Sequence, residues 1–389
     1  MGASCSTPTL KYYNLRKKKI KNQDKKYKNK NLKEYDKYEK GNNISIKKTI
    51  EDIKKEKFKY KNKINLIYFT EREGVENIFG FEFVENNSNN IDLIINGDKA
   101  KLSATYLLKE GENYITLIIK NKLIDLSYMF CNCFSLCNME ELRYLNTEKV
   151  TNFSYIFAND KYMKSMGNNI KDFHSFLDIN CLSTWNVSNG KNFDCIFRDC
   201  HKLSNIKALE KWNVSNGIIF SNMFCSCISL SDLSPLKNWN VSKGKKFDFM
   251  FIWCYSLSDI SPLKSWDVSN SETFFEMFCE CNKLSDIKAL KNWNVSKCED
   301  FSEMFYRCNK ILNLNGLDNW NVSKCQDFSK MFYGCDKLSN IESLKNWKVI
   351  KNAKFLGMFQ SCNKLSNLNP IKKWKISDKI KKEMIECDD

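Results

Sequence analysis

WNVSNGIIFSNMFCSCISLSDLSPLKN (residues 212–238) is one unit of a sequence that repeats every 27 residues. Each unit begins with a tryptophan, and these tryptophans follow one another at a constant spacing. They are Trp185, Trp212, Trp239, Trp266, Trp293, Trp320, Trp347 and Trp374. Of the nine tryptophans in the chain, only Trp253 lies off this spacing. A period of this length is typical of proteins that stack one supersecondary unit many times.

Apolar positions within the repeat predict a helix. Counted from the tryptophan, Phe recurs at +8, Met or Ile at +11, Phe at +12 and Cys at +15. These offsets follow the i, i+3, i+4, i+7 rule for a helix with one buried stripe. Serine at +3 precedes the stripe, where its hydroxyl could cap the helix. This serine is present as Ser188, Ser215, Ser242, Ser296 and Ser323.

The remainder of the repeat predicts a short strand. Leu at +18 and an aliphatic residue at +21 bracket an extended piece. Pro235, Pro262 and Pro370 at +23 cannot donate to a sheet, which limits this strand to about three residues. Each repeat would then add one short parallel strand and one helix to a stack. The expected fold class is therefore α/β.

The same pattern extends upstream of the first lattice tryptophan. Met129 and Phe130 match positions +11 and +12, and Leu145 takes the tryptophan position. About 13 additional residues interrupt the pattern somewhere in 166–181. We therefore expect the repeat region to span residues 123–389.

The repeated segment WNVSNGIIFSNMFCSCISLSDLSPL resembles the BspA-like leucine-rich repeats of bacterial surface proteins, whose signature is W-N-[VT]-S…M-F-x-x-C-x-x-L. The resemblance covers roughly residues 123–376. It implies a curved leucine-rich-repeat solenoid that binds other molecules through its surface and has no catalytic activity. The 27-residue unit is slightly longer than the family usually shows. Residues 64–122, which include INLIYFT and YITLIIK, resemble the small β-rich unit that precedes such repeats in protist members.

Net charge is concentrated in the N-terminal arm. The chain carries +16, and residues 1–63 alone hold 21 Lys and Arg against 7 Asp and Glu. We expect this segment to be a flexible polybasic arm. Because the repeats offer no aromatic stacking platforms that would bind bases, nucleic acid is not the expected partner. No apolar run is long enough to predict a membrane span or a signal peptide, so the sequence predicts a cytosolic protein.

Lipid attachment is predicted at the start of the chain. MGASCS fits the motif M-G-x-x-x-[ST], in which Gly2 accepts myristate, and Cys5 is placed for palmitoylation. One acyl chain binds a membrane only marginally, so a second signal is required. The basic residues of the arm could supply it, at roughly 1 kcal/mol each near an anionic leaflet. These are Arg16, Lys17, Lys18, Lys19, Lys25 and Lys26. The alternative is a solvated lysine-rich tail.

Cysteines at +15 form one column of the repeat. They are Cys133, Cys200, Cys227, Cys254, Cys281, Cys308, Cys335 and Cys362, and Cys131, Cys225 and Cys279 form C-x-C pairs with members of the column. One thiol per repeat is spread along a stack, whereas zinc requires four convergent ligands. We therefore expect packed thiols, with no metal and no cofactor.

Catalysis is not expected. The only histidines are His174, in the inserted segment, and His201, and neither has a nucleophile placed beside it by the sequence. Phosphate-binding glycine motifs are also missing from the sequence.

Positions +20 and +22 would lie on the exposed, concave face of the predicted strands. They include Asn205, Lys207, Asp232, Asp259, Asp286, Lys288, Asn313, Asn340 and Glu342. Three consecutive aspartates, stacked roughly 4.8 Å apart, would repel by roughly 1 kcal/mol per adjacent pair. Their alignment suggests a basic protein partner or a bound cation, although a solvated polar surface remains the alternative.

The sequence thus predicts a monomeric, non-enzymatic interaction scaffold that an acylated basic arm tethers to the cytoplasmic face of a membrane. The alternative, suggested by the resemblance, is an exported adhesin. In that protein the Asn-Val-Ser tripeptides would be glycosylated. Their asparagines are Asn186, Asn213, Asn240, Asn294 and Asn321.

Overall fold

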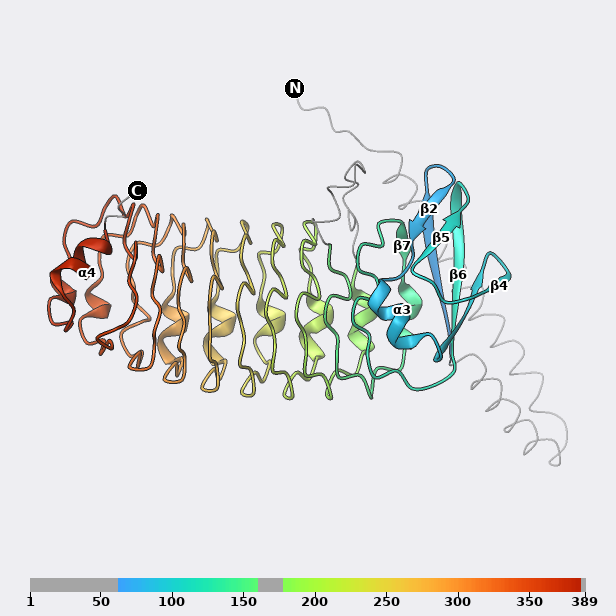
Figure 1. The fold of residues 1–389 in the computed structure, drawn as a ribbon, viewed down its shortest axis with the longest axis horizontal. Helices are drawn as coiled ribbons and strands as arrows, with labels where there is room; N and C mark the ends of the chain where they lie inside the picture. The colour runs from blue at the N-terminus through green and yellow to red at the C-terminus, as the bar shows by residue number, and fades with distance from the viewer. Residues whose placement is uncertain (1–61, 160–177, 386–389) are drawn as a thin grey trace, which may run out of the picture. The chain divides into compact units, whose positions relative to one another are not determined.

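The computed structural model describes residues 62–159 and 178–385. Contacts divide the chain into residues 1–60 and 61–389, and the second unit holds all of the described residues. Its repeats lie side by side in a row, shown from green to red in Figure 1. One hydrophobic core runs from Ile64 to Met384 without a break.

An antiparallel sheet precedes the repeats. Its strands and the single helix among them are β1 (Lys63–Thr70), β2 (Gly74–Asn77), α3 (Phe81–Asn87), β3 (Ile91–Ile95), β4 (Asp98–Ala100), β5 (Thr105–Leu108) and β6 (Gly111–Ile119). Residues alternate between buried and exposed along β1, as expected for a strand that covers a core on one face. The main sheet has the order β4-β3-β6-β1-β7, in which β7 is Leu136–Asn138, and β2 pairs with β5 separately.

The first repeat is joined to this sheet by main-chain hydrogen bonds. β7 (Leu136–Asn138) belongs to that repeat and pairs with β1 as an edge strand. Gly80, just before α3, donates its N–H to the carbonyl of Tyr128 at 3.1 Å. A Cβ atom at position 80 would lie 2.2 Å from that oxygen, so only glycine permits this approach. The sheet therefore covers one end of the repeat row.

Each repeat contains two consecutive tight turns where a helix was expected. In the repeat that begins at Trp212, the N–H of Met223 donates to Phe220 and that of Cys227 to Phe224. Both bonds join residues three apart, so each four-residue turn directs its first and last side chains inward. Positions +8, +11, +12 and +15 are consequently buried as the sequence predicts. The predicted helix is wrong, because two successive turns produce the same spacing as one helical face.

Hydrogen bonds between repeats replace those of the predicted helix. Main-chain N–H groups at +8, +10, +12 and +14 donate to carbonyls at +7, +9, +11 and +13 of the next repeat. Isolated parallel bridges at +7 run from Asp125 to Lys354. Among the described repeats, the expected strand between +18 and +21 appears only as β7 of the first repeat and as the parallel bridge between Asn313 and Asn340. The continuous bridges lie at +7 instead, and the chain after +21 forms 3-10 turns in most repeats. Prolines at +23 occupy the first turn of these short helices.

Most repeats contribute one such 3-10 helix, and the row of short coils is visible in Figure 1. They are η1 (Glu140–Tyr144), η3 (Asn180–Thr184), η4 (Lys207–Lys211), η5 (Ser234–Leu236), η6 (Ser261–Ser265), η7 (Lys288–Asn292), η8 (Glu342–Leu344) and η9 (Asn369–Ile371). Ile179 and Leu182 are buried as Ile206 and Leu209 are in the next repeat. The repeat pattern therefore resumes at Ile179, so the inserted segment ends within the expected range 166–181.

Tryptophan fixes each repeat to the one before it. All eight lattice indoles are 3–4% exposed. The Nε1–H of Trp239 donates to the carbonyl of Leu209 at 3.0 Å, and the corresponding bond recurs at each lattice tryptophan. Trp212 and Trp239 stack with ring centroids 6.5 Å apart. Replacing one of these buried rings with alanine would cost about 3–5 kcal/mol.

α4 (Asp378–Glu383) follows the last repeat. The N–H groups of Gly357 and Phe359, at +10 and +12, donate to the carbonyls of Glu383 and Met384 at 2.8 Å. The end of α4 and the residue after it thus supply two acceptors that a further repeat would otherwise provide.

The turn geometry makes a stability prediction at Ser361, which is exposed and has φ 59° at position +14. Side chains with a Cβ are disfavoured in this left-handed region, and Gly334 occupies the same position one repeat earlier. Ser361→Gly should therefore raise the free energy of unfolding, measured by urea denaturation, by up to about 1 kcal/mol. Ser361→Ala is the matched control and should change it little. A glycine variant less stable than the alanine variant would contradict the assignment of strain.

Candidate functional site

The predicted concave-face residues do not lie on a strand. Positions +20 and +22 flank the entry to the 3-10 helices, where all nine are exposed except Asn313, which is half-buried and bridges Asn340. Side chains at +20 accept hydrogen bonds from the main-chain N–H two residues later. The Oδ1 atoms of Asp232, Asp259 and Asp286 do so at 2.8, 2.7 and 2.8 Å.

This turn contact explains the aspartate column without a ligand. Asparagine makes the same bond, as Asn205 does to the N–H of Lys207 at 3.0 Å and Asn340 to that of Glu342 at 2.8 Å. Either residue stabilises such a turn through its side-chain oxygen. The alignment of Asp and Asn at +20 therefore follows from local folding, and it is not in itself a sign of a bound cation or a basic partner.

Asparagine at +1 makes a similar contact. The Oδ1 atom of Asn213 accepts from the N–H of Ser215 at 3.2 Å. The same bond recurs at Asn186, Asn240, Asn294 and Asn321. Serine at +3 was expected to cap a helix through its hydroxyl, which is wrong: the serine supplies its main-chain N–H, and the asparagine is the acceptor.

Cysteines at +15 are packed thiols. In the repeats from Cys200 onward, each donates its S–H to the carbonyl of the +12 phenylalanine in the preceding repeat, as Cys281 does to Phe251 at 3.2 Å. Burial raises the pKa of the Cys281 and Cys308 thiols far above the usual range. Because the reactive species is the thiolate, these sulfurs are unsuited to nucleophilic chemistry. Within 62–159 and 178–385, no three His, Cys, Asp or Glu side chains are grouped to hold a metal.

His201 pairs with a carboxylate rather than with a thiol. Its Nε2 lies 3.7 Å from Oδ1 of Asp199, whose other oxygen lies 3.6 Å from Nε of Arg198. The neighbouring Cys200 instead donates to the carbonyl of Phe157 at 3.4 Å. His174, Gly2, Cys5 and the basic residues of the arm lie outside the described residues.

A surface that the sequence analysis did not single out lies on the outside of the turns. We call positions +10, +13, +14 and +16 the outer turn face. Side chains at +13 form its floor, where Cys225, Ile252 and Cys279 are buried and Phe249 packs on them from +10. The one sequence signal for this surface was Trp253, which lies off the tryptophan lattice and, at 36% exposed, is far more accessible than the lattice indoles.

Aromatic and acidic side chains meet on the outer turn face. Phe249 packs edge-on against Phe275 with centroids 4.8 Å apart. The next two repeats place Glu276 and Glu303 at +10. Glu303 lies 3.7 Å from the Lys330 ammonium, whereas desolvation and the nearby Glu303 raise the pKa of Glu276 to about 7.

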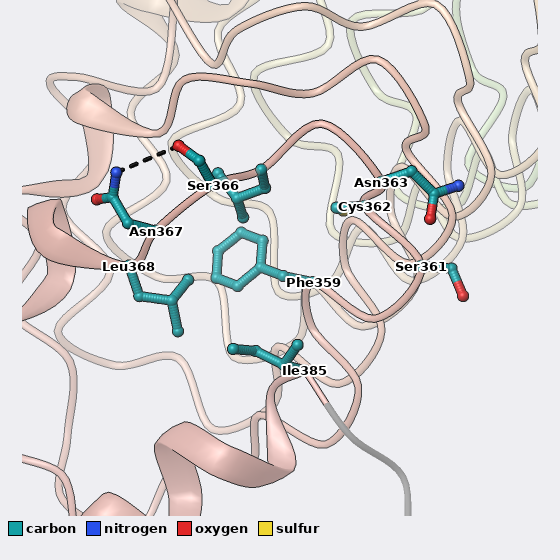
Figure 2. Close-up of a pocket in the computed structure, with 9 residues that line it drawn as sticks. Phe359, Ser361, Cys362, Asn363, Ser366, Asn367, Leu368 and Ile385 are labelled. Atoms are coloured by element: carbon teal, nitrogen blue, oxygen red, sulfur yellow. Dashed lines mark hydrogen bonds between the residues drawn. The ribbon is translucent and has the colours of Figure 1, made fainter.

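The hollow shown in Figure 2 lies at the other end of the repeat row, beside the segment that follows α4. It encloses about 270 Å³, and Phe359, Leu368 and Ile385 line it with apolar side chains. Its polar contact is a 3.3 Å hydrogen bond from the Asn367 amide to the Ser366 hydroxyl. The lining residues include no Asp, Glu, His, Lys or Arg, and Cys362 donates its S–H to the carbonyl of Phe332.

Glu276 provides a pH-dependent stability prediction. Its raised pKa means that the folded state binds this proton more tightly than the unfolded state does. The free energy of unfolding should therefore fall as pH rises from about 4.5 to about 7. Glu276→Gln should raise the melting temperature at pH 8 but not at pH 4, as measured by circular dichroism.

Glu210→Gln, which alters an exposed carboxylate, is the control and should leave both melting temperatures unchanged. Equal effects of Glu276→Gln at the two pH values would contradict the prediction.

Three overlapping segments of the chain, residues 109–205, 161–287 and 277–387, match a family model described as Mycoplasma protein of unknown function, DUF285. Together they span more than two thirds of the sequence. No curated protein and no solved structure gives a significant match to the chain.

Proposed function

The chain belongs to the DUF285 family of BspA-like repeat proteins, and we propose that it is a non-enzymatic protein-interaction scaffold. The observation that carries this proposal is the contrast between inward and outward positions. Inward +8 and +12 are phenylalanine in successive repeats, whereas outward +10 changes from Asn222 to Phe249, Glu276 and Lys330. A constant core with a varied surface favours recognition of other molecules by the stack.

Two finer structural interpretations are part of this proposal. The repeats would form a leucine-rich-repeat solenoid of the protist type, with the sheet of β1 and β6 as its leading unit. The scaffold would act as a monomer and without a cofactor, with its partner a protein rather than nucleic acid. The one-residue parallel bridges at +7 support stacking along a single axis.

Membrane tethering is the second part of the proposal. Its support is the sequence alone: the motif at Gly2, the thiol of Cys5 and the surplus of basic residues in 1–63. No helix in the described parts of the chain is both long and apolar enough to cross a bilayer. Acylation together with electrostatic attraction would hold the protein at the cytoplasmic face of a membrane.

Substitution of the acyl acceptor tests this tether. Gly2→Ala should move a C-terminally tagged protein from the membrane fraction to the soluble fraction, because the alanine cannot accept myristate. Ser6→Thr keeps the motif and is the matched control, so it should remain with the membranes. Mass spectrometry of the N-terminal peptide should show a fourteen-carbon acyl group in the control alone. If the Gly2→Ala variant is recovered in the membrane fraction as fully as the parent protein, the proposal is wrong.

One observation favours the alternative, an exported adhesin. All five Asn-Val-Ser asparagines are exposed, so a glycosyltransferase could reach them. Export predicts that external protease cleaves the repeats on intact cells and that a glycosidase increases their gel mobility. Full protection from the protease, with no change in mobility, would exclude this alternative.

A further inference from the structure

The outer turn face of the central repeats is apolar and exposed. Trp253 and Tyr255 are 36% and 40% exposed, and Ile228 of the preceding repeat is 36% exposed. The N–H of Trp253 donates to the carbonyl of Cys279, and that of Phe249 to Phe275. These bonds fix neighbouring repeats in register, so the large side chains lie at adjacent positions of neighbouring repeats. Exposed aromatic side chains in such a cluster are typical of binding surfaces.

Backbone strain accompanies this aromatic cluster. Phe249 and Trp253 both have φ 58°, in the region where bulky residues are disfavoured. The same chain places glycine at these two positions elsewhere, as Gly357 at +10 and Gly334 at +14. The fold therefore does not require an aromatic residue at either position.

An acidic area continues the cluster toward the C-terminus. The turn segments 272–282, 299–309 and 326–336 hold eight acidic and two basic side chains, in a chain of net charge +16. The two basic side chains, Arg307 and Lys330, lie 3.8 and 3.7 Å from Glu280 and Glu303. Glu276 lies between the aromatic cluster and these pairs, because the +10 column places it directly after Phe249.

We propose that the outer turn face from Ile228 to Lys330 binds an extended, basic segment of a partner protein. Apolar side chains of that segment would lie on Trp253 and Tyr255, and its lysine or arginine side chains would pair with Glu276 and Glu280. The aromatic faces would also attract the same cations. Charge complementarity selects this occupant, since an acidic segment would meet a surplus of carboxylates. The proposal rests on the scaffold function and assigns the partner surface to the turns rather than to positions +20 and +22.

Fluorescence anisotropy of a labelled peptide tests the proposal with the full-length protein. The probe is a seven-residue peptide of alternating lysine and leucine, and a peptide with glutamate in place of lysine is its control. We expect saturable binding of the basic peptide only. Glu276→Gln combined with Glu280→Gln should weaken its affinity roughly tenfold. Asp232→Asn combined with Asp259→Asn removes the same charge at +20, keeps both turn contacts, and should change the affinity less than about twofold.

Trp253→Gly provides a second variant that should remain folded, because Gly334 occupies the equivalent position. Its melting temperature should not fall below that of the parent, because glycine relieves the left-handed strain at +14, while peptide binding is lost. Equal binding of the acidic peptide, unchanged affinity in both outer-face variants, or no saturation below about 1 mM would each overturn the proposal. The Gly2→Ala fractionation does not involve this surface, so failure of the peptide assay would leave the tethering proposal intact.

Discussion

The register of main-chain hydrogen bonds between repeats is the constraint on which the remainder of the structure depends. Alternate N–H groups across the two turns donate to the next repeat, so a repeat that gained or lost one residue would misplace every donor after it. This requirement explains why the tryptophan spacing never varies from 27 residues. The one large irregularity, before Ile179, lies between positions +14 and +21, beyond the bonded turns. Insertion is therefore tolerated outside the stretch from +7 to +14, which carries the regular bonds between repeats.

Two columns of side chains, the lattice tryptophans and the +15 cysteines, also form hydrogen bonds between repeats and stabilise the same register. The lattice tryptophans donate to carbonyls at +24 of the unit two repeats earlier, and the +15 thiols donate to carbonyls at +12 of the preceding repeat. A net contribution of about 1 kcal/mol is typical of a single hydrogen bond, but an unpaired buried carbonyl costs more than the bond contributes. The cysteine column is therefore maintained by a structural requirement, and the high thiol pKa values are a consequence of the burial that this role demands.

Much of the architecture could be predicted from the periodicity of the sequence. The periodicity identified the buried positions but did not identify the backbone conformation. The 27-residue period and the buried columns at +8, +11, +12 and +15 are confirmed, because they depend only on which side chains face inward. The predicted backbone conformation, a helix, was wrong, because two four-residue turns direct the same positions inward as a helix does. Left-handed residues such as Trp253 and Glu276 distinguish the two, but apolar spacing cannot reveal φ. The aspartate column has a local role that the sequence did not show: its side chains accept hydrogen bonds from the main-chain N–H two residues later. The outer turn face was missed because its residues differ between repeats.

The direction of the hydrogen bonds makes the two ends of the repeat row chemically different. The last repeat presents main-chain N–H groups at alternate positions, and the carbonyls of Glu383 and Met384 occupy two of their acceptor sites. A bare row of main-chain donors is an unpaired edge that can pair with the backbone of another chain. The carbonyls at the end of α4 leave two fewer donors on this edge, which makes the edge a poorer template for a second chain.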